Sequence, residues 1–279
     1  MMNLLIIIER KNQPKNRNMN RSLSTYLIWL TLSLMACTPK KKPVETQKEQ
    51  ELSEILLTKA PPSVQFEDAS LKLVASNIEK DSVGYNANFD FSVENYDLAV
   101  QTEDAPQRGI ANSPKGQHIH FILNNGPYSA HYEPNISKSL NEGKYVLLAF
   151  LSRSYHESVK GNDAFYIDTV TMGNPQIKDS IDLAAQHIFY SRPKGTYTGD
   201  DTKRVMLDFF LLNTSLSENG NKVKATINDK EFMITEWAPY YIENAPIGDL
   251  KVRLELIDDK GNVIPGPFNS VERTTILAE

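Results

Sequence analysis

Short stretches of alternating apolar and polar residues recur along most of the chain. Two clear examples are residues 87–93, Ala-Asn-Phe-Asp-Phe-Ser-Val, and residues 251–256, Lys-Val-Arg-Leu-Glu-Leu. Alternation of period two predicts a β-strand with one buried and one solvated face. Turn-forming pairs such as Asn125-Gly126 and Glu142-Gly143 lie between stretches of this kind. No long segment shows the 3.6-residue period of a helix. The pattern therefore predicts an all-β chain of short antiparallel strands.

One part of this pattern occurs twice. Residues 118–123, His-Ile-His-Phe-Ile-Leu, can be aligned with residues 222–227, Lys-Val-Lys-Ala-Thr-Ile. The flanks agree too, residues 89–91 with 207–209 and residues 145–148 with 251–254. Repeats at this separation indicate duplicated domains. We therefore predict two tandem immunoglobulin-like β-sandwiches, over residues 63–173 and 187–279, joined by a linker over residues 174–186.

The start of the chain has the pattern of an export signal. Basic residues precede an apolar run over residues 26–35, which is too short to span a membrane, and Leu34-Met35-Ala36-Cys37 follows. This ending resembles the lipobox of bacterial lipoproteins, in which the cysteine becomes the acylated first residue. The resemblance implies a signal segment over residues 1–36, with the true start at Met19, and a lipid on Cys37.

The residues that follow Cys37 are polar and rich in Lys, Glu, Gln and Pro. Such a composition predicts a disordered leash over residues 37–62. A lipid anchor with a leash predicts an outer-membrane lipoprotein of the cell envelope, either periplasmic or displayed on the surface. Cys37 is the only cysteine, so no disulfide can form within the chain.

The charge balance argues against one class of partner. Residues 1–36 hold five Lys/Arg and one Asp/Glu, which leaves 30 − 5 = 25 basic and 35 − 1 = 34 acidic residues, a net charge of −9. A chain this acidic is not expected to bind nucleic acid. The expected partners are the membrane, through Cys37, and a protein or peptide ligand.

The difference between the two copies suggests a functional site. By strand parity, Ile119, Phe121 and Leu123 face the core of the first sandwich, while His118 and His120 face solvent together with Ile122. The second copy has lysines at the positions of the two histidines. The histidines are therefore expected to be surface residues rather than core residues.

The turn that follows predicts which residues join these histidines. A two-residue type I′ turn at Asn125-Gly126 would pair His120 with His131 and His118 with Glu133. Rigid histidines at i and i+2 plus one from the next strand suit Zn²⁺ or Cu²⁺. The local arrangement resembles the His-x-His plus third His of carbonic-anhydrase-type zinc sites. His156, after the strand at residues 145–151, is a possible further ligand, and Glu133 would tune or ligate the metal.

Two loops could add to this site. The first copy has 14 extra residues over the loop 97–115, since the alignment offset falls from 118 to 104, and long loops of this kind are often functional. The second loop contains Arg153, His156 and Lys160, which would suit an anion. Arg153, Glu157 and Lys160 are therefore candidate residues for binding a peptide, glycan or protein ligand without a metal. A third reading is a zinc hydrolase with Glu133 or Glu157 as general base; we expect no enzyme activity.

Several segments resemble a poorly characterised family of bacterial envelope lipoproteins with tandem immunoglobulin-like domains. They are residues 116–120, the strand around Tyr128, residues 149–154 and residues 156–158. Some relatives are catalogued as phosphopeptide-binding. The resemblance implies a ligand-binding lipoprotein, with phosphopeptide recognition as one alternative to metal binding.

Overall fold

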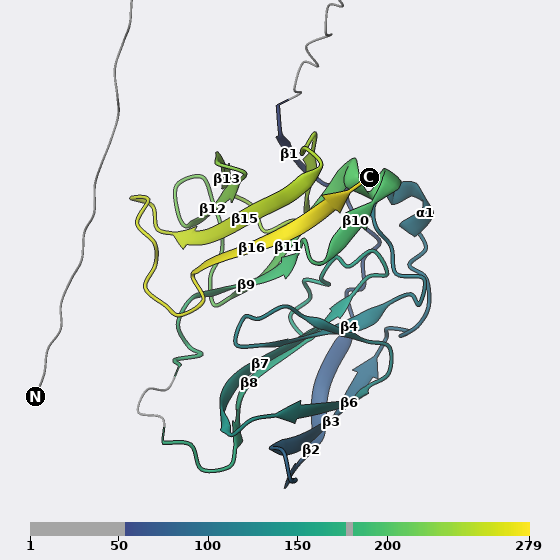
Figure 1. Cartoon of the computed structure of the whole chain (residues 1–279), viewed down its shortest axis with the longest axis vertical. Helices are drawn as coiled ribbons and strands as arrows, with labels where there is room; N and C mark the ends of the chain where they lie inside the picture. The colour runs from purple at the N-terminus through teal and green to yellow at the C-terminus, as the bar shows by residue number, and fades with distance from the viewer. Residues whose placement is uncertain (1–53, 177–180) are drawn as a thin grey trace, which may run out of the picture. The chain divides into compact units, whose positions relative to one another are not determined.

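The computed structural model describes residues 54–176 and 181–279, and these residues form four sheets in two β-sandwiches (Figure 1). All of their strand pairs are antiparallel except the parallel pair of residues 196–198 with residues 276–278. The prediction of an all-β chain with two tandem sandwiches is confirmed. Residues 1–36, Cys37 and most of the expected leash lie outside the described residues. Within the described ranges no helix has the length and apolar character needed to cross a membrane.

The first sandwich packs the sheet β2-β3-β6 against the sheet β5-β4-β7-β8. Its strands are β2 (Ser70–Lys80), β3 (Tyr85–Glu94), β4 (His118–Leu123), β5 (Ser129–His131), β6 (Asn135–Leu140), β7 (Gly143–Ser152) and β8 (Phe165–Met172). A short helix, α1 (Ala105–Arg108), lies in the loop between β3 and β4. Phe89, Ile119, Phe121 and Leu147 are fully or almost fully buried in the core between the two sheets.

The second sandwich packs the sheet β1-β14-β11-β9 against the sheet β10-β16-β15-β12-β13. Its elements are β1 (Leu56–Lys59), β9 (His187–Arg192), β10 (Thr196–Thr198), the 3₁₀ turn η1 (Gly199–Thr202), β11 (Arg204–Leu212), β12 (Lys222–Ile227), β13 (Lys230–Ile234), β14 (Tyr240–Glu243), β15 (Gly248–Ile257) and β16 (Ser270–Ala278). Val223, Ala225 and Ile227 lie in its core, as alternation predicts.

The two sandwiches share strand order and turn chemistry, which is the structural form of the duplication. β4 lies between β5 and β7, as β12 lies between β13 and β15. In the matching turns, Asn124 and Asn228 both have positive φ, and each side-chain oxygen accepts a 2.8 Å hydrogen bond from the backbone, from Val146 N and Lys251 N respectively. By these bonds Val146 occupies the position of Lys251, whereas the sequence alignment pairs Lys251 with Tyr145.

The expected end of the leash is wrong, whereas the expected linker does lie between β8 and β9. The leash was expected to extend to residue 62, but β1 pairs antiparallel with β14 of the second sandwich. A segment that precedes the first sandwich thus completes the second, because backbone pairing at an open sheet edge satisfies its amide groups. In the expected linker, Ile181 and Leu183 pack against the apolar cluster that joins the sandwiches.

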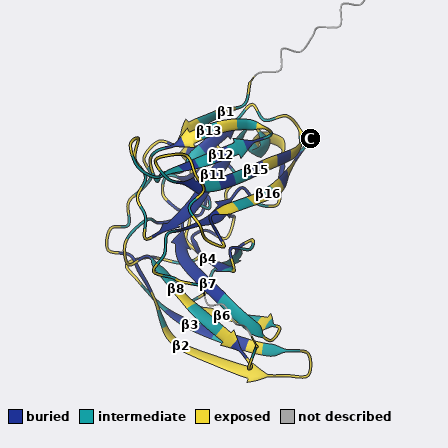
Figure 2. Ribbon diagram, turned by 90° about the vertical axis from the view of Figure 1, so that its left-hand side faces the viewer, coloured by how far each residue is buried: buried dark blue, intermediate teal, exposed yellow. Residues whose placement is uncertain are grey.

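That cluster, which we call the interdomain cluster, buries the outer face of β4. Ile122 on β4 together with Val146, Leu148 and Phe150 on β7 packs against residues of the second sandwich, among them Phe189, Phe210, Leu212 and Phe268. Phe150 and Phe210 stack with ring centroids 5.2 Å apart. Figure 2 shows β4 and much of β7 buried, in contrast to the exposed β2. Both faces of β4 and of most of β7 are therefore covered.

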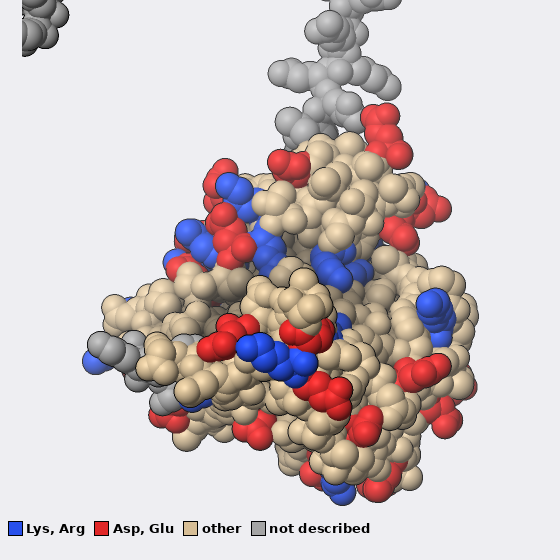
Figure 3. Space-filling model, turned by 60° about the horizontal axis from the view of Figure 1, so that its bottom comes forward, with Lys and Arg blue, Asp and Glu red and all other residues tan. Residues whose placement is uncertain are grey.

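The surface charge is mixed on the side that Figure 3 shows. Acidic side chains are spread over that face with basic ones between them, and no continuous basic surface is visible there. Such a surface offers a polyanion no extended attraction.

Candidate functional site

Three histidine rings meet at the seam between the sandwiches. His118 and His120 come from the outer face of β4, and His156 comes from the turn after β7; their nearest ring nitrogens all lie within 4.8 Å of one another. His118 Nε2 is 2.9 Å from His120 Nε2 and 3.1 Å from His156 Nδ1. We call these three residues the histidine cluster. Among the described residues it is the only group of three or more His, Cys, Asp or Glu side chains with this geometry.

The strand parity behind the site is confirmed, but its expected solvent exposure is wrong. His118 and His120 point away from the core of the first sandwich, yet both have a relative exposure of 0%. The second sandwich covers them: Ser191 Oγ lies 3.2 Å from His120 Nδ1. On the other side, the Tyr128 ring stacks on His120 with centroids 3.6 Å apart and an interplanar angle of 10°.

The expected place of His131 is also wrong. The positive-φ residues of the turn are Asn124 and Asn125, one position before the expected pair, and Gly126 N donates to Leu123 O. An extra residue on the second strand then sets the register, so that His131 pairs with Ile119 and His120 pairs with Ala130. A shift of one residue moves a side chain to the other face of a sheet. His131 therefore lies on the side of Phe121, with ring centroids 5.9 Å apart, and is not part of the cluster.

Glu133 does not join the cluster either. It is exposed and lines a shallow hollow together with Lys115, His131 and Tyr132. Glu157, the other expected base, accepts a 2.6 Å hydrogen bond from Ser63 Oγ and forms an ion pair with Arg153. Neither carboxylate is a member of the cluster, so the geometry gives no support to a hydrolase that uses one of them as a base.

His156 occupies the place expected for His131. Its backbone φ is +70°, in the left-handed region, and its amide donates to Arg153 O. That conformation costs about 1–2 kcal/mol for a residue with a Cβ. The turn holds it, and strained residues of this kind concentrate at functional sites. The ring is half-buried and is the cluster's most exposed member.

The protein environment keeps the three imidazoles neutral. Burial lowers the pKa of His118 to about 4, and burial followed by the nearby His118 and His156 holds the pKa of His120 well below its usual value. Burial and then the Arg192 guanidinium do the same to the pKa of His156. Neutral imidazole is the form that binds a metal ion.

The hydrogen bond behind His118 fixes the direction of its free lone pair. His118 Nδ1 lies 2.8 Å from the Gly116 carbonyl oxygen. Since a carbonyl only accepts, this nitrogen carries the proton, and Nε2 presents its lone pair to the cluster. A backbone carbonyl in this role is a common support for a metal-binding histidine.

That lone pair is approached by two nitrogens at once, His120 Nε2 and His156 Nδ1. A single lone pair accepts one N–H well, so hydrogen bonding among neutral rings satisfies only one of the two approaches. A shared cation would satisfy all three nitrogens. In a tetrahedral zinc site with bonds of about 2.0–2.1 Å, neighbouring ligand nitrogens are about 3.3–3.4 Å apart. The separations of His118 Nε2 from the other two nitrogens, 2.9 and 3.1 Å, are a few tenths of an ångström shorter.

The loop residues expected to bind a ligand have internal partners instead. Arg153 donates to Val64 O through Nε and Nη2 and to Ser158 O through Nη1, and it is 3% exposed. Lys160 Nζ lies 2.8 Å from Asp208 Oδ1 of the second sandwich. Arg153, Glu157 and Lys160 therefore hold the N-terminal segment and the two sandwiches together, and their charges are not free for an anionic ligand.

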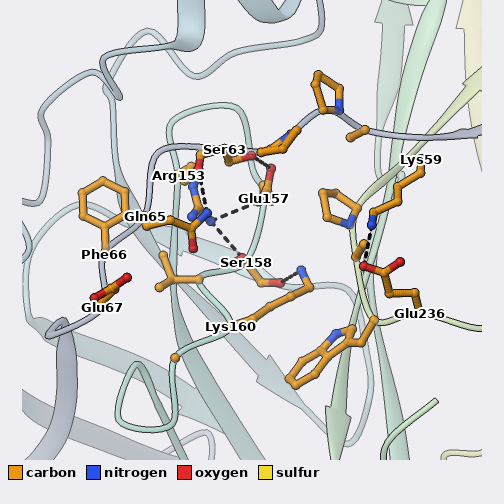
Figure 4. A pocket seen from close by; sticks show the side chains of 18 of the residues that line it. Lys59, Ser63, Gln65, Phe66, Glu67, Arg153, Glu157, Ser158, Lys160 and Glu236 are labelled. Atoms are coloured by element: carbon orange, nitrogen blue, oxygen red, sulfur yellow. Dashed lines mark hydrogen bonds and ion pairs between the residues drawn. The ribbon is translucent and has the colours of Figure 1, made fainter. Parts of the chain in front are cut away.

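These residues line a cavity of about 840 Å³ (Figure 4). Its walls come from residues 59–67, the turn over residues 153–162, and residues 236–239 of the second sandwich. Phe66 and Trp237 are among its apolar walls. Figure 4 shows the Arg153 side chain linked to the Glu157 carboxylate and to the Ser158 carbonyl oxygen, and the Lys160 ammonium linked to the Ser158 hydroxyl.

The long loop 97–115 packs against this turn and not over the imidazoles. Ser113 N donates to Ser154 O, and the Asp104 carboxylate accepts from Tyr155 Oη and pairs with Arg108. Arg108 in turn donates to the carbonyl oxygens of Pro61 and Pro62. The loop thus supports the turn that carries His156. None of these contacts is made to an imidazole of the cluster, so they give no support to the loop as a lid over it.

Tyr128 and Arg192 complete the surroundings of the cluster. Tyr128 Oη lies 3.3 Å from His156 Nδ1 and accepts a 2.9 Å hydrogen bond from Arg192 Nη1.

The sequence holds one general signal for such a covered site. β7, β9 and β11 are nearly continuous apolar runs, which indicates burial on both faces, whereas β12 and β15 alternate.

The fold and the site thus define a protein of two β-sandwiches with a largely buried three-histidine cluster at their seam. No protein-family model matches this chain, and no curated protein matches it.

Solved structures similar to this chain include the fibronectin(III)-like modules of Clostridium thermocellum CbhA, at 10% identity over 73% of this chain and 94% of that chain, with a TM-score of 0.26. The two tandem V-type regions of VCBP3, a v-region-containing chitin binding protein, match at 8% identity over 81% and 99%, with a TM-score of 0.22. SGBP-B of the Bacteroides ovatus mixed-linkage glucan utilization locus, in complex with a heptasaccharide, matches at 11% identity over 75% and 70%, with a TM-score of 0.22. Function has to be inferred from this chain's own residues.

Proposed function

We propose that this protein is a non-catalytic, envelope-anchored binding protein that holds one transition metal ion, Zn²⁺ or Cu²⁺, in the histidine cluster. The observation that carries the proposal is the convergence of His120 and His156 on the single lone pair of His118. Neutral, desolvated imidazoles with a fixed ring orientation suit either ion.

The metal would have a defined structural effect. It would link β4 to the turn after β7 beneath the covering Ser191 of the second sandwich. Bound ions that recognise only the folded state stabilise it. Metal loading is therefore expected to raise the unfolding temperature and to tighten the seam.

The test compares two histidines of the first sandwich. Mature protein is treated with chelator, offered Zn²⁺ or Cu²⁺, and analysed for bound metal by mass spectrometry. Wild type and His131→Ala should take up about one ion per chain, and His156→Ala should lose tight binding. Failure of wild type to take up either ion, or equal loss in His131→Ala, would contradict the proposal.

Anchoring through Cys37 is the second part of the proposal, and it rests on the lipobox-like sequence Leu34-Met35-Ala36-Cys37. Cells fed a clickable fatty acid should label the wild-type protein and not Cys37→Ser. Labelling that persists in the variant would argue against acylation at this cysteine.

A second candidate function is metal-independent binding of an uncharged glycan or peptide in the 840 Å³ cavity. The paired state of its cations, with Lys59 on Glu236 and Lys160 on Asp208, favours an uncharged ligand over a phosphopeptide. Trp237 is the only tryptophan after the signal segment, so its fluorescence would report binding. A glycan or peptide that changes this fluorescence equally with and without chelator, and no longer binds Trp237→Ala, would favour this candidate.

A further inference from the structure

A second group of polar atoms near the seam lacks partners. Twelve buried side-chain atoms of the described residues have no hydrogen-bond partner, and six of them belong to the strands β9, β10 and β16 of the second sandwich. One of the six is His187 Nδ1 at the start of β9, and the other five form this group. They are Tyr190 Oη, Arg192 Nε, Tyr197 Oη, Arg273 Nη1 and Thr275 Oγ1. Buried polar groups are nearly always satisfied, so such a concentration calls for an explanation.

The two arginines of this group have no acidic partner. Arg192 is 5% exposed, and its one side-chain hydrogen bond to protein goes from Nη1 to Tyr128 Oη. Arg273 donates from Nη2 to the Asn125 carbonyl at 2.6 Å. Neither has a carboxylate oxygen within 4.0 Å among the described residues, whereas the buried Arg108 and Arg153 both do. A buried charge without a counterion is strongly unfavourable.

Each guanidinium of this group lies beside one of its tyrosine rings. The Arg273 guanidinium is 4.5 Å from the Tyr190 ring centroid, and the Arg192 guanidinium is 5.1 Å from that of Tyr197. Burial, then the positive charges of Arg192 and Arg273, lower the pKa of the Lys194 ammonium, so both guanidinium groups act on a third cation here. Burial also lowers the pKa of Arg273.

We propose that these residues form a binding site for a small oxyanion of the phosphate or sulfate kind. Arg192 Nε and Arg273 Nη1 would donate charge-assisted hydrogen bonds, and the Tyr190 and Tyr197 hydroxyls would donate two more. A tetrahedral oxyanion offers several acceptor oxygens to donors that arrive from different strands, whereas chloride offers a single centre. A charge of −2 also fits three neighbouring cations better than a charge of −1.

The test uses the chelator-treated mature protein, so that it does not depend on the metal proposal. Inorganic phosphate and sulfate are titrated calorimetrically, with sodium chloride at matched ionic strength as the reference. Wild type should bind about one phosphate or sulfate per chain. Arg273→Gln should weaken this binding at least about tenfold, because it removes a charged donor. Arg204→Gln is the matched control, since that guanidinium already pairs with Glu243, and it should bind like wild type.

Tyr197→Phe provides a milder variant in case Arg273→Gln folds poorly, because it removes only one hydroxyl group. It should weaken phosphate binding severalfold while its circular dichroism matches that of wild type. The proposal is overturned if wild type shows no heat beyond the chloride reference. It is also overturned if Tyr197→Phe and the folded Arg273 variant bind phosphate as tightly as wild type, or if Arg204→Gln loses as much affinity as they do.

Discussion

β4 and β12 occupy the same place in the two sandwiches, but the outer face of β4 is buried and that of β12 is partly exposed. The inner residues of both strands, Ile119 and Phe121 in one and Val223 and Ala225 in the other, fill their own cores. On the outer face of β4, His118, His120 and Ile122 are 0% exposed. The outer face of β12 is partly exposed, and there Lys224 pairs with Glu255.

The difference comes from what packs outside each sheet. The sheet that contains β4 is covered by β9 and β11 of the second sandwich through the interdomain cluster, while the outer side of β12 has no comparable cover within the described residues. The same i, i+2 geometry therefore gives solvated charges on one strand and dry, neutral imidazoles on the other. Burial, and not the strand itself, makes the histidine cluster a candidate metal site.

The largest expected effect comes from placing a charge on each outer face. Ile122→Lys buries an ammonium in the interdomain cluster and should destabilise the fold by at least about 4 kcal/mol. Thr226→Lys, at the matching position, should change stability by less than about 1 kcal/mol. Urea unfolding of the two variants measures the contrast; similar losses in both would show that the seam does not bury this face.

The second contrast concerns metal affinity. His120→Ala removes a ligand nitrogen and should weaken Zn²⁺ binding by about a hundredfold or more, since even supporting residues contribute 10–100-fold. Lys224→Ala, on the matching residue of β12, should change it less than about twofold. Competition with a zinc-sensitive dye gives both constants. An unchanged affinity in His120→Ala would remove this residue from the site.

The third contrast uses the matching turns. The buried Asn125 side chain donates to Ile188 O and accepts from Tyr190 N across the seam, whereas the matching Asp229 is exposed. Both residues have positive φ, so an alanine brings similar strain to each. Asn125→Ala should therefore cost about 1–3 kcal/mol more than Asp229→Ala in thermal unfolding. Equal costs would mean that the turn does not bond the sandwiches together.

The smallest expected effect is a pH dependence of the metal-free protein. His118 has a folded-state pKa of about 4, below its ordinary value of 6.5, so the unfolded chain takes up the proton first as the pH falls. The stability that neutral His118 contributes is complete above pH 6.5 and is lost between pH 6.5 and about 4. His118→Gln should flatten this part of the stability curve, while Lys222→Gln, on the matching residue, should leave its slope unchanged.

Alternation predicted the strands and the inward and outward faces of β4 and β12 correctly, because parity is a local property of an extended backbone. The register was wrong because two adjacent asparagines can adopt positive φ, and the turn uses Asn124 and Asn125 rather than Asn125 and Gly126. One added residue then moved His131 from the expected site to the side of Phe121. The leash prediction was wrong at β1 for a different reason. The four residues of β1 form a strand by backbone pairing with β14, which lies far away in the sequence and leaves no local signal at β1.

The sequence alone determined the all-β class, the duplication, the faces of each strand and the unusual gathering of histidines in one copy. The tertiary structure alone decided that His118 and His120 are buried and that His156 is the third ring of the histidine cluster. It also decided that Arg153 and Lys160 hold the fold together. The reason is physical range: strand parity acts between neighbouring residues, but the cover over His120 comes from Ser191, 71 positions away along the chain.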